Sequence, residues 1–214
     1  MSVAAVVVAA GRGRRFGGAK QFTPLGAETV AARSVRTARS VASYVVLVVP
    51  ANYEGNGEGA DLIVTGGDSR AASVRAGLVH CGDAEIVVVH DAARPLASAA
   101  LFHSVVEAVR AGADAAVPGL TLTDTVKRVS TNAEGTHVVA TLLREELVAV
   151  QTPQAFRRNV LVRAHESEDD ASDDAALVEA LGLRVVVVEG EVDNVKITHL
   201  RDIDVLGIVE RNRP

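Results

Sequence analysis

The apolar residues of the chain fall into short runs separated by stretches with helical spacing. Runs at 3–10, 44–49 and 86–90 are dominated by Val and Ala, which is typical of strands buried on both faces. Weaker runs predict further strands at residues 62–64, 115–117, 148–151 and 184–189. Apolar positions three and four residues apart predict helices at residues 28–40, about 70–80, 98–111, 157–166 and 173–181, and from about 201 onward.

The alternation of strands and helices predicts an α/β fold with a Rossmann-like, doubly wound, mostly parallel sheet. We expect one domain over residues 1–214, with its ligand site beyond the carboxyl ends of the strands. Local signals add detail. Pro118 is expected to end the strand before it, Ser172 to cap the helix after it, and the acids of 166–174 to form a solvated loop and helix start.

The stretch from about 120 to 145 breaks this alternation. Residues 124–129 and 136–141 flank the turn-like 132–135, a pattern that predicts a β-hairpin. A lone hairpin is marginally stable in water, so we expect it to be an arm that packs on a second copy of the chain in a homodimer. The alternative is a hairpin folded back onto its own domain.

Composition excludes several classes of protein. With 214 residues, 48% of them hydrophobic, the chain can bury a substantial core. A net charge of −5 argues against a protein that coats nucleic acid or an anionic membrane. The first apolar run is too short to span a bilayer, and its basic residues follow it, unlike those of a secretion signal. The single cysteine, Cys81, fits a core position and a reducing compartment, so we expect a soluble cytoplasmic protein.

The loop after the first strand carries a concentration of positive charge without any acid. Its cations are Arg12, Arg14, Arg15 and Lys20. They predict an anionic ligand, most simply a polyphosphate. Two known glycine motifs fit poorly, because Phe16 replaces the third small residue of a dinucleotide fingerprint and Gln21 follows the lysine where a phosphate loop has Ser or Thr. A solvated basic turn is the alternative.

Asp91 directly follows a predicted buried strand, which places a carboxylate at the mouth of the sheet. Mg²⁺ is usually held by one or two carboxylates together with the phosphates of its nucleotide, so we expect the ion at this residue. In the alternative, Asp91 caps the next turn and pairs with Arg94. His90 is interpreted as a strand-end histidine with satisfied hydrogen bonds.

Six blocks of residues, read together, resemble one known family. They are AAGRGRRF at 9–16 with KQF at 20–22, GGDSR at 66–70, VHDAARP at 89–95, DT at 124–125, QTPQ at 151–154 and DNVKIT at 193–198. Over nearly its whole length the chain is similar to the 2-C-methyl-D-erythritol 4-phosphate cytidylyltransferase family. The first block belongs to many sugar nucleotidyltransferases, whereas the HDAARP and DNVKIT blocks are more specific to this branch.

The resemblance implies transfer of a cytidylyl group from CTP to 2-C-methyl-D-erythritol 4-phosphate, with release of pyrophosphate, in the non-mevalonate route to isoprenoids. It also implies roles for residues by position. Arg15 and Lys20 stabilise the transition state, and Asp91 holds Mg²⁺. The positions for CTP are Ala9, Ala10, Gly11, Gly13, Gly67, Asp68 and Ser73. The positions for the acceptor are Arg94, Thr125, Arg144 and Lys196, of which the last two orient its phosphate.

The resemblance has local departures and leaves rival functions open. Ala19, Ser172 and Asp174 stand where the family usually has proline, threonine and glutamate, and the residues around Arg144 match poorly. In the family the arm crosses to the partner subunit, which implies that Thr125 and Arg144 serve the neighbour's site. The sequence alone leaves open that they serve the site of their own chain. A cytidylyltransferase for another polyol phosphate, such as ribitol 5-phosphate, is the nearest rival. A catalytically silent nucleotide-binding module is the second.

Overall fold

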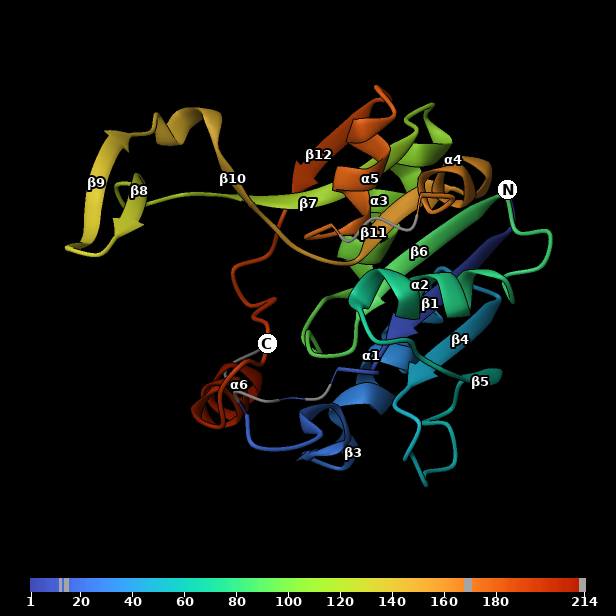
Figure 1. The fold of residues 1–214 in the computed structure, drawn as a ribbon. Coiled ribbons are helices and arrows are strands. Elements are labelled where there is room, and N and C mark those ends of the chain that lie inside the picture. The colour runs from blue at the N-terminus through green and yellow to red at the C-terminus, as the bar shows by residue number, and fades with distance from the viewer. Residues whose placement is uncertain (12, 14–15, 168–170, 212–214) are drawn as a thin grey trace.

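The computed structural model describes residues 1–11, 13, 16–167 and 171–211, and a single twisted sheet runs through its centre (Figure 1). The sheet has eight strands, with β12 (Val185–Glu189) paired to β7 off the main path. The order along that path is β10 (Val148–Val150), β7 (Ala115–Thr121), β11 (Gln154–Arg157), β6 (Ile86–Asp91), β1 (Val3–Val8), β4 (Tyr44–Val49) and β5 (Leu62–Thr65). The predicted α/β class is confirmed.

The sheet is mostly parallel, as the alternation predicts. β1 lies between β6 and β4 and is parallel to both, and β4 is parallel to β5. β11 runs antiparallel to both β6 and β7. The register places Val8 beside Asp91 on one side and beside Val48 on the other. The carboxyl ends of these strands therefore meet at one edge.

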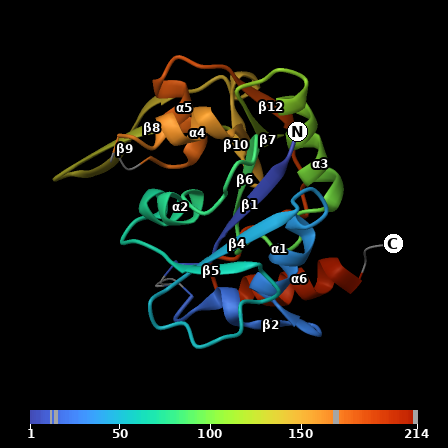
Figure 2. The same cartoon turned by 90° about the vertical axis from the view of Figure 1, so that its right-hand side faces the viewer.

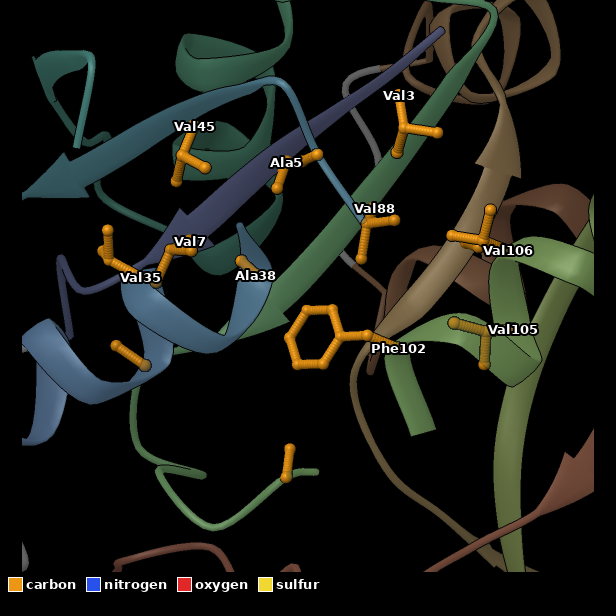
Figure 3. Close-up of a cluster of buried hydrophobic side chains, with 14 of the residues drawn as sticks. Val3, Ala5, Val7, Val35, Ala38, Val45, Val88, Phe102, Val105 and Val106 are labelled. Atoms are coloured by element: carbon orange, nitrogen blue, oxygen red, sulfur yellow. The ribbon is translucent and has the colours of Figure 1, made fainter. Parts of the chain in front are cut away.

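Helices cover both faces of the sheet because alternate residues of each central strand point to opposite sides. Ala5 and Val7 of β1 face α1 (Val30–Ala38) and α3 (Ala99–Arg110). Figure 3 shows this cluster, with Phe102 of α3 beside the strands. The odd positions of β1 thus serve one core; Ala4 and Val6 serve the other.

The second core lies against α2 (Arg70–Leu78), α4 (Arg158–Ala164) and α5 (Asp174–Ala180). Figure 2 shows these three helices on the opposite side of the sheet from α1 and α3. Cys81 is buried in this core, where desolvation raises the pKa of its thiol to about 11. The prediction that Cys81 fills the core is confirmed.

A third, smaller core packs the last helix of the chain against the segment that follows the opening loop. α6 (Arg201–Arg211) buries Leu206 against Ile197 and against Leu25 in β2 (Pro24–Leu25), which pairs with β3 (Glu28–Thr29). Val30 of α1 and Leu96 join the same cluster. No helix in the described part of the chain is long and apolar enough to cross a membrane.

The predicted hairpin is confirmed. β8 (Lys127–Asn132) and β9 (Gly135–Thr141) form a separate two-stranded sheet that projects from the body, and we call the segment 120–145 the arm (Figure 1). Gly135 closes the turn with a φ of 123°, which only glycine adopts readily. Every residue of β8 is exposed.

One local prediction about the strands is wrong, and one strand is missed. Pro118 lies inside β7 and does not end it. Its carbonyl accepts a hydrogen bond of 2.9 Å from the N–H of Gln151, at the junction where the partner of β7 changes from β11 to β10. A missing N–H is tolerated at such a junction. The sequence pattern also does not predict β11, because four residues between a loop and a helix are too short a pattern to recognise.

Two predictions about the acidic stretch are also wrong. Asp173, and not Ser172, caps α5, because its side chain accepts a hydrogen bond of 3.0 Å from the N–H of Ala176. Asp174 is not solvated; it is 1% exposed and pairs with Arg70 and His165. Helical periodicity does not reveal that partner, since Arg70 lies more than a hundred positions earlier.

Candidate active site

A cleft of about 690 Å³ opens at the edge where the strands end. Its predicted lining residues are Ala9, Ala10, Gly11, Gly13, Lys20, Gly67, Asp68, Ser73, Asp91 and Lys196. Arg94, Thr125 and Arg144 are described but do not line this cleft. Arg15 lies outside the described residues, so its predicted role is not placed.

Asp91 lies at the centre of the charged end of the cleft. Its Oδ1 is 3.1 Å from Nε of Arg70, and its Oδ2 is 2.5 Å from Nζ of Lys196. Burial alone would raise the pKa of Asp91, but the two cations outweigh it and hold the pKa well below the usual range. The carboxylate is therefore ionised. The alternative pairing of Asp91 with Arg94 is not observed, since Nη1 of Arg94 donates to the carbonyl of Asn194 at 2.7 Å.

His90 lies beneath Asp91 and is fully buried. Its Nδ1 is 3.1 Å from Oγ1 of Thr152, and its Nε2 is 3.2 Å from the carbonyl oxygen of Arg94. The same Thr152 hydroxyl accepts a hydrogen bond of 3.0 Å from the N–H of Asp91. Desolvation lowers the pKa of His90 to about 4, so the ring is neutral. The interpretation of a satisfied strand-end histidine is confirmed.

The segment that carries Lys196 is fixed on both sides of the lysine. On one side, Asn194 is fully buried, and its Nδ2 donates to the carbonyl of Thr152 at 2.9 Å and to Oε1 of Gln151 at 3.2 Å. On the other side, the N–H of Ile197 donates to the carbonyl of Ala93 at 2.8 Å, and its side chain is buried in the third core. These anchors present the ammonium of Lys196 to the cleft.

The opening loop reaches the same point from the other end of the chain. Lys20 begins the short 3₁₀ helix η1 (Lys20–Phe22), and its ammonium donates to the carbonyl of Ile197, next to Lys196. Gln21 is buried, and its Nε2 donates to the carbonyls of Ala9 at 2.6 Å and of Gly11 at 3.2 Å. Gln21 thus ties η1 to the loop after β1. Lys20 and Lys196, far apart in sequence, converge on one cleft.

The other end of the cleft is lined by small residues, among them Ala10, Gly11, Gly67 and Ser73. A methyl group added to Gly66 would lie 2.4 Å from Cβ of Ala10 and 2.7 Å from Oγ of Ser73. Ser73 is itself held by a hydrogen bond of 2.9 Å from its hydroxyl to the carbonyl of Ser69, the residue that caps α2. Residues with little or no side chain leave backbone groups accessible to a flat, small ligand at this end.

The predicted acceptor residues of the arm lie apart from the cleft lining. Arg144 begins the short helix η2 (Arg144–Glu146), and its Nη1 donates to the carbonyl of Thr123 at 2.6 Å. Its Nε lies 3.3 Å from Oε1 of Glu145. Thr125 is exposed between the body and β8. Within one chain the structure therefore does not bring Thr125 and Arg144 to Lys20 and Asp91.

Sequence reasoning missed the residues that hold the predicted ones in place. They are Gln21, Arg70, Thr152, Asp174 and Asn194. Four of them stand inside the quoted motif blocks, so a signal existed. The motifs do not say that Arg70 and Asn194 act through other residues, because that depends on contacts between distant segments.

The residues of the cleft fit a divalent cation that needs only one ligand from the protein. Among the described residues, no three His, Cys, Asp or Glu side chains are grouped so as to enclose a metal. Asp91 offers an ionised carboxylate toward the cleft. This donor fits an ion that takes one protein oxygen and completes its shell with phosphate and water, as Mg²⁺ does.

Comparison with known proteins agrees with this geometry. The family model for 2-C-methyl-D-erythritol 4-phosphate cytidylyltransferase (IspD) matches residues 3–209. A protein of that name from Streptomyces avermitilis is 44% identical over 220 residues, covering 94% of this chain and 88% of the relative. A bifunctional IspD/IspF enzyme from Anaeromyxobacter dehalogenans is 45% identical over 94% of this chain, which spans 55% of that enzyme.

Comparison with solved structures points to the same family. The crystal structure of 2-C-methyl-D-erythritol 4-phosphate cytidylyltransferase from Thermus thermophilus matches with a TM-score of 0.81 and 35% sequence identity. The match covers 99% of this chain and 98% of that one. The resemblance inferred from the six motif blocks is confirmed. The chain belongs to the 2-C-methyl-D-erythritol 4-phosphate cytidylyltransferase family.

Proposed function

We propose that this chain transfers a cytidylyl group from CTP to 2-C-methyl-D-erythritol 4-phosphate, giving 4-diphosphocytidyl-2-C-methyl-D-erythritol and pyrophosphate in the non-mevalonate isoprenoid pathway. One observation carries the proposal: Lys20, Asp91 and Lys196 line a single cleft whose other end is lined by small residues such as Ala10, Gly11 and Gly67. This arrangement argues against a silent binding module, because the charged groups gather where a triphosphate would react.

The reaction needs charge stabilisation more than proton transfer. The acceptor phosphate has a second pKa of about 6, so at neutral pH an oxygen of its dianion can attack without a general base. That oxygen forms a bond to the α-phosphorus of CTP, the bond from the α-phosphorus to the bridging oxygen breaks, and the electron pair leaves with pyrophosphate. Lys20 and Lys196 offset the negative charge that two polyanions bring together.

A metal would share this task. We propose that Asp91 holds Mg²⁺ together with the phosphates of CTP. The bound ion would neutralise charge on the triphosphate as it develops. Lys196, whose ammonium lies 2.5 Å from Oδ2 of Asp91, would then be available to orient the acceptor phosphate.

The arm supports a proposal about assembly. Thr125 and Arg144 carry the acceptor assignments, yet neither lines the cleft of its own chain. We propose that the chain forms a homodimer in which the arm brings Thr125 and Arg144 to the partner's cleft. The exposed apolar side chains of the arm, including Val129 and Val138, favour such burial.

The substrate is tested by measuring pyrophosphate release from CTP and Mg²⁺ with each candidate acceptor. We expect turnover with 2-C-methyl-D-erythritol 4-phosphate and little with ribitol 5-phosphate. Turnover with ribitol 5-phosphate alone would replace the proposed acceptor and keep the cytidylyl chemistry. No release of pyrophosphate with either acceptor would overturn the proposal as a whole.

A further inference from the structure

The two oxygens of Asp91 are held in unequal ways. Oδ1 contacts Nε of Arg70, which is the first residue of α2. Oδ2 contacts Nζ of Lys196, whose side chain is 42% exposed and extends from a loop. The side chain of Arg70 is 23% exposed, and a flexible, more exposed ammonium leaves a carboxylate oxygen more easily than a less exposed, forked guanidinium does.

Arg70 is itself fixed from behind. Its Nη1 lies 2.7 Å from Oδ2 of Asp174, and the other oxygen of Asp174 lies 2.9 Å from Nε2 of His165. The side chains of Asp174 and His165 are 1% and 2% exposed, and neither lines the cleft. The series of contacts from Asp91 through Arg70 and Asp174 to His165 therefore leads from the cleft into the packing of α4 and α5.

Two charges act on Arg70 from opposite sides. Burial alone would lower the pKa of the guanidinium, but Asp91 and Asp174 outweigh it and raise the pKa above its ordinary value. Arg70 thus stays charged between two carboxylates, and its two ion pairs fix the plane of the fork. A guanidinium held in this way fixes the carboxylate that it contacts.

We propose that Arg70, held by Asp174 and His165, is a positioning residue that fixes the Asp91 carboxylate so that Oδ2 is its exchangeable oxygen. The inference rests on the proposed function, in which Asp91 would hold the metal that accompanies CTP and Lys196 would orient the acceptor phosphate. Partners of a metal-binding carboxylate usually matter in this way, since their loss weakens metal affinity or activity by about 10- to 100-fold.

Asp174→Asn tests the proposal, because Asp174 does not touch the cleft. The variant keeps the shape of the side chain but loses the charge that holds Arg70. We expect binding of the Mn²⁺ complex of CTP, followed by the electron paramagnetic resonance of Mn²⁺, to weaken about 10-fold or more, and the Mg²⁺ concentration for half-maximal rate to rise with it. A normal Mn²⁺ titration for a folded Asp174→Asn protein would overturn the proposal.

Asp61→Asn is the matched control. Asp61 also pairs with an arginine, Arg39 at 3.1 Å, and accepts a hydrogen bond of 2.7 Å from the N–H of Val45, at the amino end of β4 and away from the cleft. This variant should lower the thermal stability while leaving the Mn²⁺ titration unchanged. An equal effect of both variants on Mn²⁺ binding would show that loss of stability is the whole cause, which contradicts the proposal.

Arg70→Lys keeps the test open if Asp174→Asn does not fold. Lysine retains the charge but cannot bridge two carboxylates with a planar fork. We expect the same weakening of Mn²⁺ binding, and no further weakening in the Arg70→Lys/Asp174→Asn double variant, because Asp174 acts through Arg70. Additive effects would mean that the two residues act separately, which contradicts the proposal. Since Mn²⁺ binding needs no turnover, it remains informative even if the wild-type chain proves inactive on the proposed acceptor.

Discussion

The cleft and the arm carry residues that the sequence assigns to one reaction, yet the two regions are built in opposite ways. In the cleft, Gln21, Ser73 and Asp91 are 3%, 2% and 8% exposed, and each side chain has a hydrogen-bond partner. On the arm, every residue of β8 is exposed. Burial and paired polar groups fix a catalytic geometry, whereas an exposed hairpin has few contacts to do so.

The difference fits the proposal that a second copy of the chain covers the arm. Val138 and Leu143 are 63% and 65% exposed, and the side-chain bonds of Arg144 run to Thr123 and Glu145. Apolar side chains on a lone hairpin gain stability only when something covers them. A second copy of the chain would supply that cover.

The largest effect is expected from Lys20→Ala. The ammonium of Lys20 faces the cleft beside Ile197 and Lys196, where charge develops during transfer. Loss of one preorganised charged donor should lower kcat by about 10²- to 10³-fold. Steady-state pyrophosphate release measures this, with circular dichroism to show that the fold is intact.

Lys127→Ala is the control from the arm. Lys127 begins β8, is exposed, and donates a hydrogen bond of 2.7 Å to Oγ1 of Thr141. We expect its kcat to stay near the wild-type value. A similar loss of rate in both variants would mean that a lysine on the arm matters as much as one in the cleft. The contrast between the two regions would then fail.

A smaller effect is expected when two impaired variants are mixed. Partial recovery of activity would test whether the arm acts on the partner's cleft. Lys20→Ala and Arg144→Ala should each have a strongly reduced rate alone. In mixed dimers, one cleft combines an intact Lys20 with an intact Arg144 from the other chain, so random mixing should restore about a quarter of the wild-type sites. Activity after the two variants are unfolded and refolded together measures it. No recovery, with mixed dimers shown to form, would place Arg144 in its own chain's site or outside the reaction.

The sequence predicts most of the fold because its central strands carry strong signals. Runs such as 44–49 and 86–90 are apolar throughout most of their length, and the structure makes them β4 and all of β6 but its last residue. Prediction failed where partners distant in sequence decide the outcome. Pro118 continues its strand because Gln151 pairs beside it, and Asp174 is buried because Arg70 reaches it.

The candidate site follows the same division. Motif blocks correctly predict that Lys20, Asp91 and Lys196 share a cleft, since each stands at a strand end or in a loop beside one. They do not reveal that Arg70 connects Asp91 to α5, or that Gln21 ties η1 to the loop after β1. Those roles arise from contacts made only when the chain is folded, so no local pattern announces them.

Stability should separate the two regions as activity does. Leu47 of β4 is fully buried in the core against α1 and α3, so Leu47→Ala should lower the free energy of unfolding by about 2 to 5 kcal/mol. Val139 of β9 is 56% exposed, and Val139→Ala should change it by about 0.5 kcal/mol or less in the monomer. Urea unfolding at low protein concentration measures both. Equal losses would show that the arm is part of the body's cooperative unit.

The smallest effect concerns the pH dependence of stability beneath the cleft. Burial lowers the pKa of His90 from 6.5 to about 4, so between these values the unfolded chain binds a proton that the folded chain does not. The stability that a neutral, buried His90 contributes is therefore fully present above pH 6.5 and is lost as the pH falls toward 4. The loss reaches roughly 2 kcal/mol at pH 5.

Urea midpoints between pH 7 and pH 4.5 for the wild-type chain and for His90→Gln measure this loss. We expect the variant to lose less stability than the wild type on acidification, because Gln cannot take up a proton. Leu47→Ala is the control, since it should be less stable at every pH while keeping the wild-type slope. If His90→Gln keeps that slope as well, the acid sensitivity arises elsewhere, and the buried ring beneath Asp91 is not what makes the cleft region respond to pH.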